Sequence, residues 1–429
     1  MRDRAGRQAL ERSLAVDALL YSASAIFAVR SMGASSLLRN RTWADFAWPA
    51  YAAGASVAVV LAVVGARLAR AQVLRARLAL AAVVAAGAVF VPLAVEVQWR
   101  TEPARAPASS LHPYGASEVV LTEGAARELL RGRDPYSASF TSHELDGRSP
   151  GTAQHFPYLP GMIAFGLPYA LAPGAAWTDA RLFFLAVTAV AAALALRRWR
   201  APPEQRLRAV QVLVVLPTGA AALVTGGDDV PVLALCLLAL ALFDSGRRAA
   251  SMWAAAAAAI LKLTAWPLLL ALAVVAPRGR GRLALGAVGL VTLTAAAAGP
   301  VDFVDDVLLF PAGLSDLPSP AASTTLGSTM IAPVRESPTS RVVMTVALIA
   351  VGLAVAVIVL RALARRTRVS AADVAIATGL VLLAVIVLAP VARSGYLVYP
   401  LDLFAWAMVL RAREPVSVRV GESREALAW

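Results

Sequence analysis

Apolar segments long enough to cross a lipid bilayer recur along the whole chain. A helix needs about 20 predominantly apolar residues to span the hydrocarbon core. Such segments occupy 13–32, 46–66, 78–98, 210–226, 229–244, 283–299, 341–361, 370–390 and 396–411. Apolar residues make up 59% of the 429 residues and charged residues only 16%, which excludes a soluble, a disordered or a fibrous protein. The chain is therefore predicted to be an all-α polytopic membrane protein.

The connections between these segments carry runs of arginine. The runs lie at 2–12, 67–77, 197–200, 278–282, 361–368 and 411–413, in a chain of net charge +13. Short arginine runs between apolar segments are topology signals, because arginine-rich loops of bacterial membrane proteins stay in the cytoplasm. They form no continuous patch of the kind that binds nucleic acid. With a composition typical of a GC-rich bacterial genome, we expect a multi-pass plasma-membrane protein with a cytoplasmic N-terminus and the loops 99–156 and 300–340 outside.

Two regions do not fit a simple count of crossings. Residues 157–197 must cross an odd number of times, yet they are long enough for two helices. Residues 250–276 start and end inside, yet they are too short for two full spans. Both are predicted to contain broken or re-entrant helices, which Pro160, Pro168 and Pro267 favour. Non-helical backbone is tolerated at membrane depth only where it is buried in protein or lines a cavity, so these regions predict a ligand cavity.

The chain is predicted to form one membrane domain with four parts. They are a three-helix N-terminal extension with the first spans (1–98), an extracytoplasmic loop (99–156), a membrane bundle with the outer loop 300–340 (157–411) and a cytoplasmic tail (412–429). Cys236 is the only cysteine and lies inside an apolar run, so neither a disulfide nor a thiolate metal site is expected.

The loop 99–156 has the richest polar chemistry in the chain. Residues 117–130 are compatible with a helix, for which Ser117 is a plausible N-cap and Gly132 a plausible stop. Glu118 would lie in the first turn, where the positive end of the helix favours a carboxylate.

A series of motifs in a fixed order gives the chain a resemblance to a known class. Glu118 is followed by Ala-Ala-Arg-Glu-Leu-Leu-Arg-Gly at 125–132, by Asp134-Pro135-Tyr136, and by Phe-Pro-Tyr-Leu-Pro-Gly at 156–161. Further on come Thr-Gly-Gly-Asp-Asp at 225–229, Lys262 with Pro267, and Ala-Pro-Val-Ala-Arg-Ser-Gly-Tyr at 389–396. This order resembles the integral-membrane glycosyltransferases of the GT-C class, and among them the bacterial polyprenyl-phosphate-mannose-dependent α-mannosyltransferases.

The resemblance implies a fold and a reaction. The fold would be a GT-C-like bundle of about 10–13 transmembrane or re-entrant helices, with short interfacial helices on a long first extracytoplasmic loop. The reaction would move a hexose, with mannose the expected sugar, from a polyprenyl-phosphate carrier to a cell-envelope lipid or glycan acceptor. It would be inverting and would use one carboxylate as general base, with no cofactor and no metal implied. The position of the family's aspartate falls near Glu118 here, and Glu123 is the alternative base.

Further residues are candidates for contact with substrate. Lys262 and Arg393 are cations that could hold a phosphate, although Gly395 occupies the place where the family often has histidine. Each candidate also has a structural alternative, such as a turn, a helix N-terminus or an interfacial anchor. The full set of substrate-binding candidates is Asp134, Tyr136, His155, Tyr158, Asp228, Asp229, Lys262, Arg393 and Tyr396.

Two other classes of function stay open at this point. A transporter or flippase for polyprenyl-linked sugars or small solutes would share the broken helices and the buried charges. A non-catalytic component of envelope assembly would keep the fold and lack the base, and glutamate in place of aspartate is compatible with that loss. The sequence does not indicate an oligomeric state.

Overall fold

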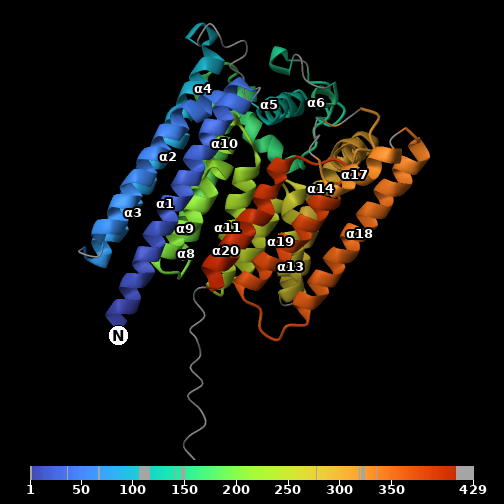
Figure 1. Ribbon diagram of the computed structural model, residues 1–429. Coiled ribbons are helices and arrows are strands. Elements are labelled where there is room, and N and C mark those ends of the chain that lie inside the picture. The colour runs from blue at the N-terminus through green and yellow to red at the C-terminus, as the bar shows by residue number, and fades with distance from the viewer. Residues whose placement is uncertain are drawn as a thin grey trace, which may run out of the picture.

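The computed structural model describes residues 2–411 except 36, 66–67, 106–115, 141, 146–149, 277, 318, 320–323 and 335. Every regular element in the described part is helical, as expected for an all-α membrane protein (Figure 1). The helices run between two ends of the molecule. One end, called the loop face here, carries α5 (Ser117–Leu130), and the opposite end, the arginine face, carries the N-terminus and the turns with Arg247 and Arg365.

The N-terminal extension consists of two long helices and a third that is interrupted. Helices α1 (Arg2–Ala34) and α2 (Leu38–Val64) pack against each other along their length. They are followed by α3 (Arg70–Ala85), the π-turn η2 (Ala86–Phe90) and α4 (Val91–Thr101). Asp17 faces a neighbouring helix, as the sequence predicts, and accepts hydrogen bonds from Arg77 (2.5 Å) and Gln211 (3.2 Å). The Tyr51 hydroxyl donates to the carbonyl of Val215 (2.6 Å), so the extension is bonded to the rest of the bundle.

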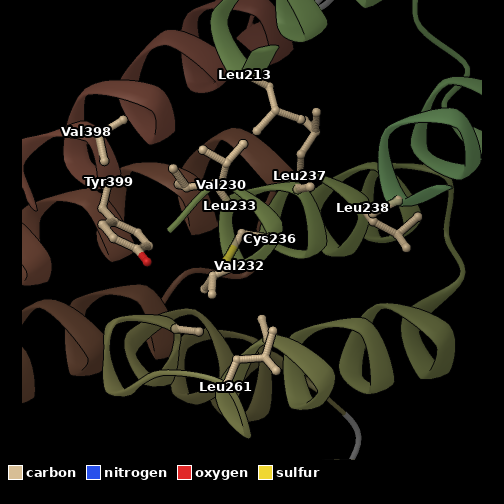
Figure 2. Packing of buried hydrophobic residues seen from close by; sticks show 14 of the residues in the cluster. Leu213, Val230, Val232, Leu233, Cys236, Leu237, Leu238, Leu261, Val398 and Tyr399 are labelled. Atoms are coloured by element: carbon tan, nitrogen blue, oxygen red, sulfur yellow. The ribbon is translucent and has the colours of Figure 1, made fainter. Parts of the chain in front are cut away.

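The centre of the bundle is α11 (Asp229–Asp244), which is buried over almost its whole length. It packs against α8 (Ala180–Arg198) and against a bent segment made of α9 (Pro203–Val210), η7 (Gln211–Val215) and α10 (Pro217–Thr225). The bend is 41°, and its cause is Pro217, which cannot donate the backbone hydrogen bond that a continuous helix needs. In the core around α11, Leu213, Leu261 and Tyr399 pack from three distant parts of the chain (Figure 2).

Both irregular regions contain the expected breaks. In 157–197 a short irregular segment, η5 (Pro160–Gly166) with α7 (Leu167–Leu171), precedes the single long helix α8. In 250–276, α12 (Arg248–Ala259) stops at an extended Lys262, and η8 (Leu263–Ala265) with α13 (Trp266–Val275) follows it. The break lies at the loop-face end of α11, because Lys262 donates to Asp228 there. The pair α12 and α13 therefore enters from the arginine face and returns to it.

The last helices complete the bundle and leave one helix at its edge. Helix α14 (Arg278–Ala298) leads to the outer loop, which contains the short helices α15 (Pro300–Val304), η9 (Asp305–Leu309), α16 (Phe310–Ala312), α17 (Leu326–Ile331) and η10 (Ala332–Val334). Three helices follow: α18 (Pro338–Ala364), α19 (Ala371–Leu388) and, after η11 (Ser394–Leu397), α20 (Val398–Arg411). Helix α18 stands at the periphery and packs mainly on α19 and α13 (Figure 1).

In the described residues, seven helices are long and apolar enough to cross a membrane, and the bent pair makes up to eight. The shorter α11 and α20 and the broken segments bring the arrangement into the expected range of about 10–13 helices. Each of the nine apolar segments of the sequence is mostly helical, although 78–98 and 210–226 each run over several helical elements. The predicted tail 412–429 lies outside the described residues.

Candidate active site

Helix α5 carries Glu118 and is held at the loop face by two glycines. At Gly226, which ends α10 with a φ of +99°, a side chain would collide with Val119 of α5. At Gly166 a Cβ atom would lie 2.2 Å from the carbonyl oxygen of Thr122. The backbone of Ala116 also donates to the carbonyl of Thr225 (2.9 Å). Glycine is thus needed at both contacts, and they set the start of α5 against the turn that precedes α11.

The start of α5 differs in one detail from the prediction. The N-cap position belongs to Ala116, so Ser117 is the first helical residue and does not cap the helix. Its hydroxyl donates instead to Oε2 of Glu118 (3.2 Å). Gly132 has a φ of +72° just after the helix, in agreement with its predicted role as a stop.

Glu118 forms an ion pair with Arg393, which comes from the last loop-face turn. Nη1 of Arg393 donates to Oε1 of Glu118 at 2.6 Å. The Arg393 side chain is 39% exposed and the Glu118 side chain 15%. Burial alone raises the pKa of the Glu118 carboxyl, but Arg393 beside it and the further charges of Arg39 and Lys262 hold that pKa below its ordinary value. Glu118 is therefore ionised in this arrangement at neutral pH.

Lys262 joins the two aspartates of the glycine-rich turn. Its Nζ donates to Asp228 at 2.5 Å and to Asp229 at 2.6 Å, and it lies 5.2 Å from the centre of the Tyr158 ring. The Tyr399 hydroxyl donates to Asp229 at 2.7 Å. Asp228 also precedes α11, where the helix N-terminus stabilises its charge. Lys262 is thus a buried cation with two carboxylate partners.

A cavity of about 420 Å³ begins beside these charges. Its polar lining lies near the loop face and comprises Ser117, Thr152, His155, Tyr158, Lys262, Thr264, Ser319, Arg393 and Tyr396. Its apolar lining comes mainly from α13, α18 and α19 and includes Leu270, Gly352, Leu353, Ala356, Leu360, Val381, Leu382, Val385 and Ile386. The cavity thus combines a polar end at the loop face with an apolar groove beside the peripheral helix α18.

His155 lies in the cavity wall and is held from both sides. Its Nδ1 is 2.6 Å from Oδ1 of Asp306, its Nε2 is 3.3 Å from the hydroxyl of Ser315, and its ring stacks on Phe310. Burial raises the pKa of Asp306 to about 6, although hydrogen bonds from the Phe156 N–H and from His155 act in the opposite direction.

His155, Asp305 and Asp306 are also a group of potential metal ligands. Their ligand atoms lie within 4.8 Å of one another, and no other such group occurs in the described part of the chain. These atoms are engaged in hydrogen bonds with each other and with Ser315. The expectation that no metal is required stays a prediction.

Three residues of the predicted site lie elsewhere. Both oxygens of Glu123 accept from Arg100 (2.9 and 2.7 Å), which also pairs with Glu144 and Asp179. Glu123 is fully buried, and both of its oxygens are held by Arg100, so the alternative base is placed in a structural ion network.

Asp134 and Tyr136 likewise have structural contacts and do not line the cavity. Asp134 accepts from the Tyr136 N–H (3.1 Å), which forms the turn at Pro135. The Tyr136 hydroxyl donates to the carbonyl of Tyr158 (3.1 Å), and its ring packs on Phe303. Neither residue is therefore brought to the charges around Glu118.

Sequence reasoning missed several residues that build the site. Tyr399 follows the Tyr396 motif by three residues and lies inside an apolar segment, so nothing distinguished it from a packing residue. Asp306 and Ser315 contact His155 across 151 and 160 residues of sequence. The three acids at 302, 305 and 306 are the only signal that could have drawn attention to them.

The comparisons with known proteins fit this geometry. The model of glycosyltransferase family 87 matches residues 156–412, which include Lys262, Arg393 and both aspartates of the glycine-rich turn. The match begins after α5, so Glu118 lies outside it. No curated protein matches the chain. The match supports a membrane glycosyltransferase of the GT-C type, the class that the sequence motifs resemble, and the chain belongs to glycosyltransferase family 87.

Proposed function

We propose that this glycosyltransferase moves a hexose, with mannose the favoured candidate, from a polyprenyl-phosphate carrier to a cell-envelope lipid or glycan. The reaction would take place at the loop face, which would be the outer face of a bacterial plasma membrane. Glu118 would act as general base, and the anomeric centre would be inverted. The observation that carries this proposal is the cavity with a charged end and an apolar groove.

The two ends of the cavity suit the two ends of such a donor. A polyprenyl-phosphate sugar has a polar head and a long hydrocarbon tail that lies in the bilayer. Arg393 and Lys262 at the polar end offer cations for the phosphate. The groove along α13, α18 and α19 offers an apolar surface at membrane depth, next to a helix that has few other neighbours.

The transfer requires one base and a stabilised leaving group. The hydroxyl oxygen of the acceptor attacks the anomeric carbon, a new C–O bond forms, and the bond between that carbon and the phosphate oxygen breaks. The lipid phosphate leaves with the bonding electrons. Glu118 would take the hydroxyl proton, and Arg393 would stabilise the charge that develops on the phosphate. One displacement at one carbon inverts its configuration.

The sugar and the side of the membrane are inferred from other observations. Mannose follows from the resemblance to polyprenyl-phosphate-mannose-dependent enzymes. The outer location follows from the arginine runs, whose described parts lie at the end of the molecule opposite α5.

A transfer assay in membranes tests the proposal. Radiolabelled polyprenyl-phosphate mannose would be offered together with a pool of envelope lipids, and product formation would be compared among the intact chain, Glu118→Gln and Glu128→Gln. Glu128 is a matched control because it lies on α5 but pairs with Arg131 and Arg133. Loss of a general base costs about 10²–10⁴-fold in rate, so we expect that loss only in Glu118→Gln.

Two results would contradict the proposal in different ways. Transfer that survives in Glu118→Gln would move the base to another carboxylate, with Asp228 next to be tested. Transfer by the intact chain from a nucleotide sugar, and from no lipid-linked donor, would overturn the proposed donor class.

A further inference from the structure

We propose that Arg393 changes partner during the reaction, pairing with Glu118 in the donor-free enzyme and with the donor phosphate once the donor is bound. This exchange would release Glu118 as a base only after the donor has arrived. It rests on the proposed function, since it assigns a role to the same two residues. In this scheme Arg393 is a positioning residue for the base as well as a ligand for the phosphate.

The geometry of the pair permits such an exchange. Glu118 and Arg393 are joined by the single contact of 2.6 Å between Nη1 and Oε1. The guanidinium group has further N–H groups, its side chain is 39% exposed, and it lines the cavity. A phosphate that enters the polar end therefore meets Arg393 directly. The free N–H groups can bind the phosphate first, and a bidentate pairing through two parallel hydrogen bonds then competes with the single contact that holds Glu118.

Lys262 is less suited to respond to the donor. It is held by Asp228 and Asp229 together, and its side chain is only 9% exposed. Its positive charge is thus offset by two nearby carboxylates, whereas among the described residues Arg393 pairs with one carboxylate, that of Glu118. An incoming phosphate should draw the cation that has the fewer anionic partners and the greater exposure.

The exchange also explains how Glu118 could act as a base although it is paired with Arg393 in the donor-free protein. A carboxylate in contact with a guanidinium has a reduced affinity for protons, which makes it a poor general base. When the guanidinium moves to the phosphate, the proton affinity of the carboxylate rises while the leaving group gains a counter-ion. Donor binding would therefore precede activation of the acceptor.

A double-mutant cycle on binding tests the exchange. A polyprenyl phosphate without sugar would be titrated against the purified full-length chain in lipid nanodiscs, and its dissociation constant measured for wild type, Glu118→Gln, Arg393→Gln and the double variant. If Glu118 competes with the phosphate for Arg393, Glu118→Gln binds the probe about tenfold more tightly. The same substitution in the Arg393→Gln background then gives no gain.

The cycle separates the exchange from a general charge effect. Removing any nearby carboxylate reduces repulsion of an anion, and that gain would persist without Arg393. A gain of equal size in both backgrounds, or no gain in either, would overturn the exchange. Glu128→Gln makes the same change of charge elsewhere on α5 and is expected to leave the dissociation constant within about twofold. Thermal unfolding of each variant confirms that it is folded, and Arg393→Met, which also removes the guanidinium group, replaces Arg393→Gln if that variant is unstable.

The binding measurement is independent of sugar transfer. If the cycle gives the expected coupling but no donor supports transfer by the intact chain, the proposed reaction fails and the exchange stands. If transfer depends on Glu118 but the cycle shows no coupling, the reaction stands and the exchange fails.

Discussion

At the scale of single residues, the two charges that would do the chemistry neutralise each other. Glu118 would have to accept a proton, and Arg393 would have to hold a phosphate, yet in the donor-free protein they are paired at 2.6 Å. The ion pair also explains how a mostly buried carboxylate can stay ionised at the membrane surface. If this ion pair is broken when the donor binds, activity should be lost on the acid side at a different pH in the free enzyme and in the enzyme–substrate complex.

The pH dependence of transfer should therefore give two different pKa values for Glu118, one in the free enzyme and one in the enzyme–substrate complex. In the free enzyme the charges of Arg393, Arg39 and Lys262, together with a backbone hydrogen bond, outweigh burial, so the pKa of Glu118 is below its ordinary value and the acid limb of kcat/KM is low. In the complex Arg393 lies on the phosphate, burial dominates, and the pKa of Glu118 rises. The acid limb of kcat is thus expected about one pH unit or more above that of kcat/KM. Coincident limbs in a full pH–rate study would argue against the exchange.

Glu123 is expected to matter for stability and not for chemistry. Its two oxygens accept from Arg100 and one also accepts from the N–H of Ala180 (3.1 Å). Glu123→Gln places an amide N–H₂ against the guanidinium, and we expect a loss of about 3 kcal/mol in the free energy of unfolding. Glu128→Gln, at a more exposed pair, should cost under about 1 kcal/mol. Unfolding followed in detergent, with transfer measured per folded molecule, decides whether activity falls beyond the loss of folded protein.

The sequence pointed to most of the individual site residues but not to their partners. Glu118 and Arg393 were found through separate motifs that lie 275 residues apart, and no local pattern indicates that they touch. Spacing from Gly132 favoured Glu118 over Glu123, but it did not indicate what each carboxylate contacts. What separates them is Arg100, which lies in a different helix, so the distinction depends on tertiary packing.

At the scale of elements, breaks in helices create the site. Proline and the parity of crossings were enough to predict a re-entrant segment at 250–276, and α12 and α13 form it. The sequence did not indicate which residues contact the break between α12 and α13. The backbone N–H of Leu159 donates to Leu261 (3.1 Å) and that of Gly161 to Ile260 (3.0 Å). These bonds fix Lys262 beside the glycine-rich turn.

The groove along α18 gives a prediction about chain length. A Cβ atom on Gly352 would lie 3.9 Å from Val385, so a small side chain fits, but a phenylalanine there would fill the groove between α18 and α19. We expect Gly352→Phe to raise KM about tenfold for a long polyprenyl donor and much less for a donor with only a few isoprene units. Gly286→Phe on α14 is the control, because nothing lies within 4 Å of a Cβ atom there. If KM changed equally for long and short donors, the hypothesis that the polyprenyl tail binds in this groove would be rejected.

At the scale of the whole molecule, the helices before the family match contribute to the site. The matched region begins at 156, whereas Glu118, which pairs with Arg393 in the matched region, precedes it. The N-terminal extension is tied to the matched part through Asp17, whose Oδ1 lies 2.8 Å from Nη1 of Arg208. Apolar segment length was sufficient to predict the extension, but not this link, because Asp17 could have faced any neighbouring helix.

The orientation of the molecule in the membrane can be tested by labelling single cysteines introduced at its two ends. Cys236 is buried, so the unmodified chain should react little with a membrane-impermeant maleimide. Ser137 is exposed at the loop face and Thr367 is exposed in the arginine-rich turn between α18 and α19. Because arginine-rich loops remain in the cytoplasm, Ser137→Cys should be labelled in intact cells and Thr367→Cys only after permeabilisation. The reverse pattern would place Glu118 and the cavity's polar end in the cytoplasm, where an acceptor in the outer envelope could not reach them.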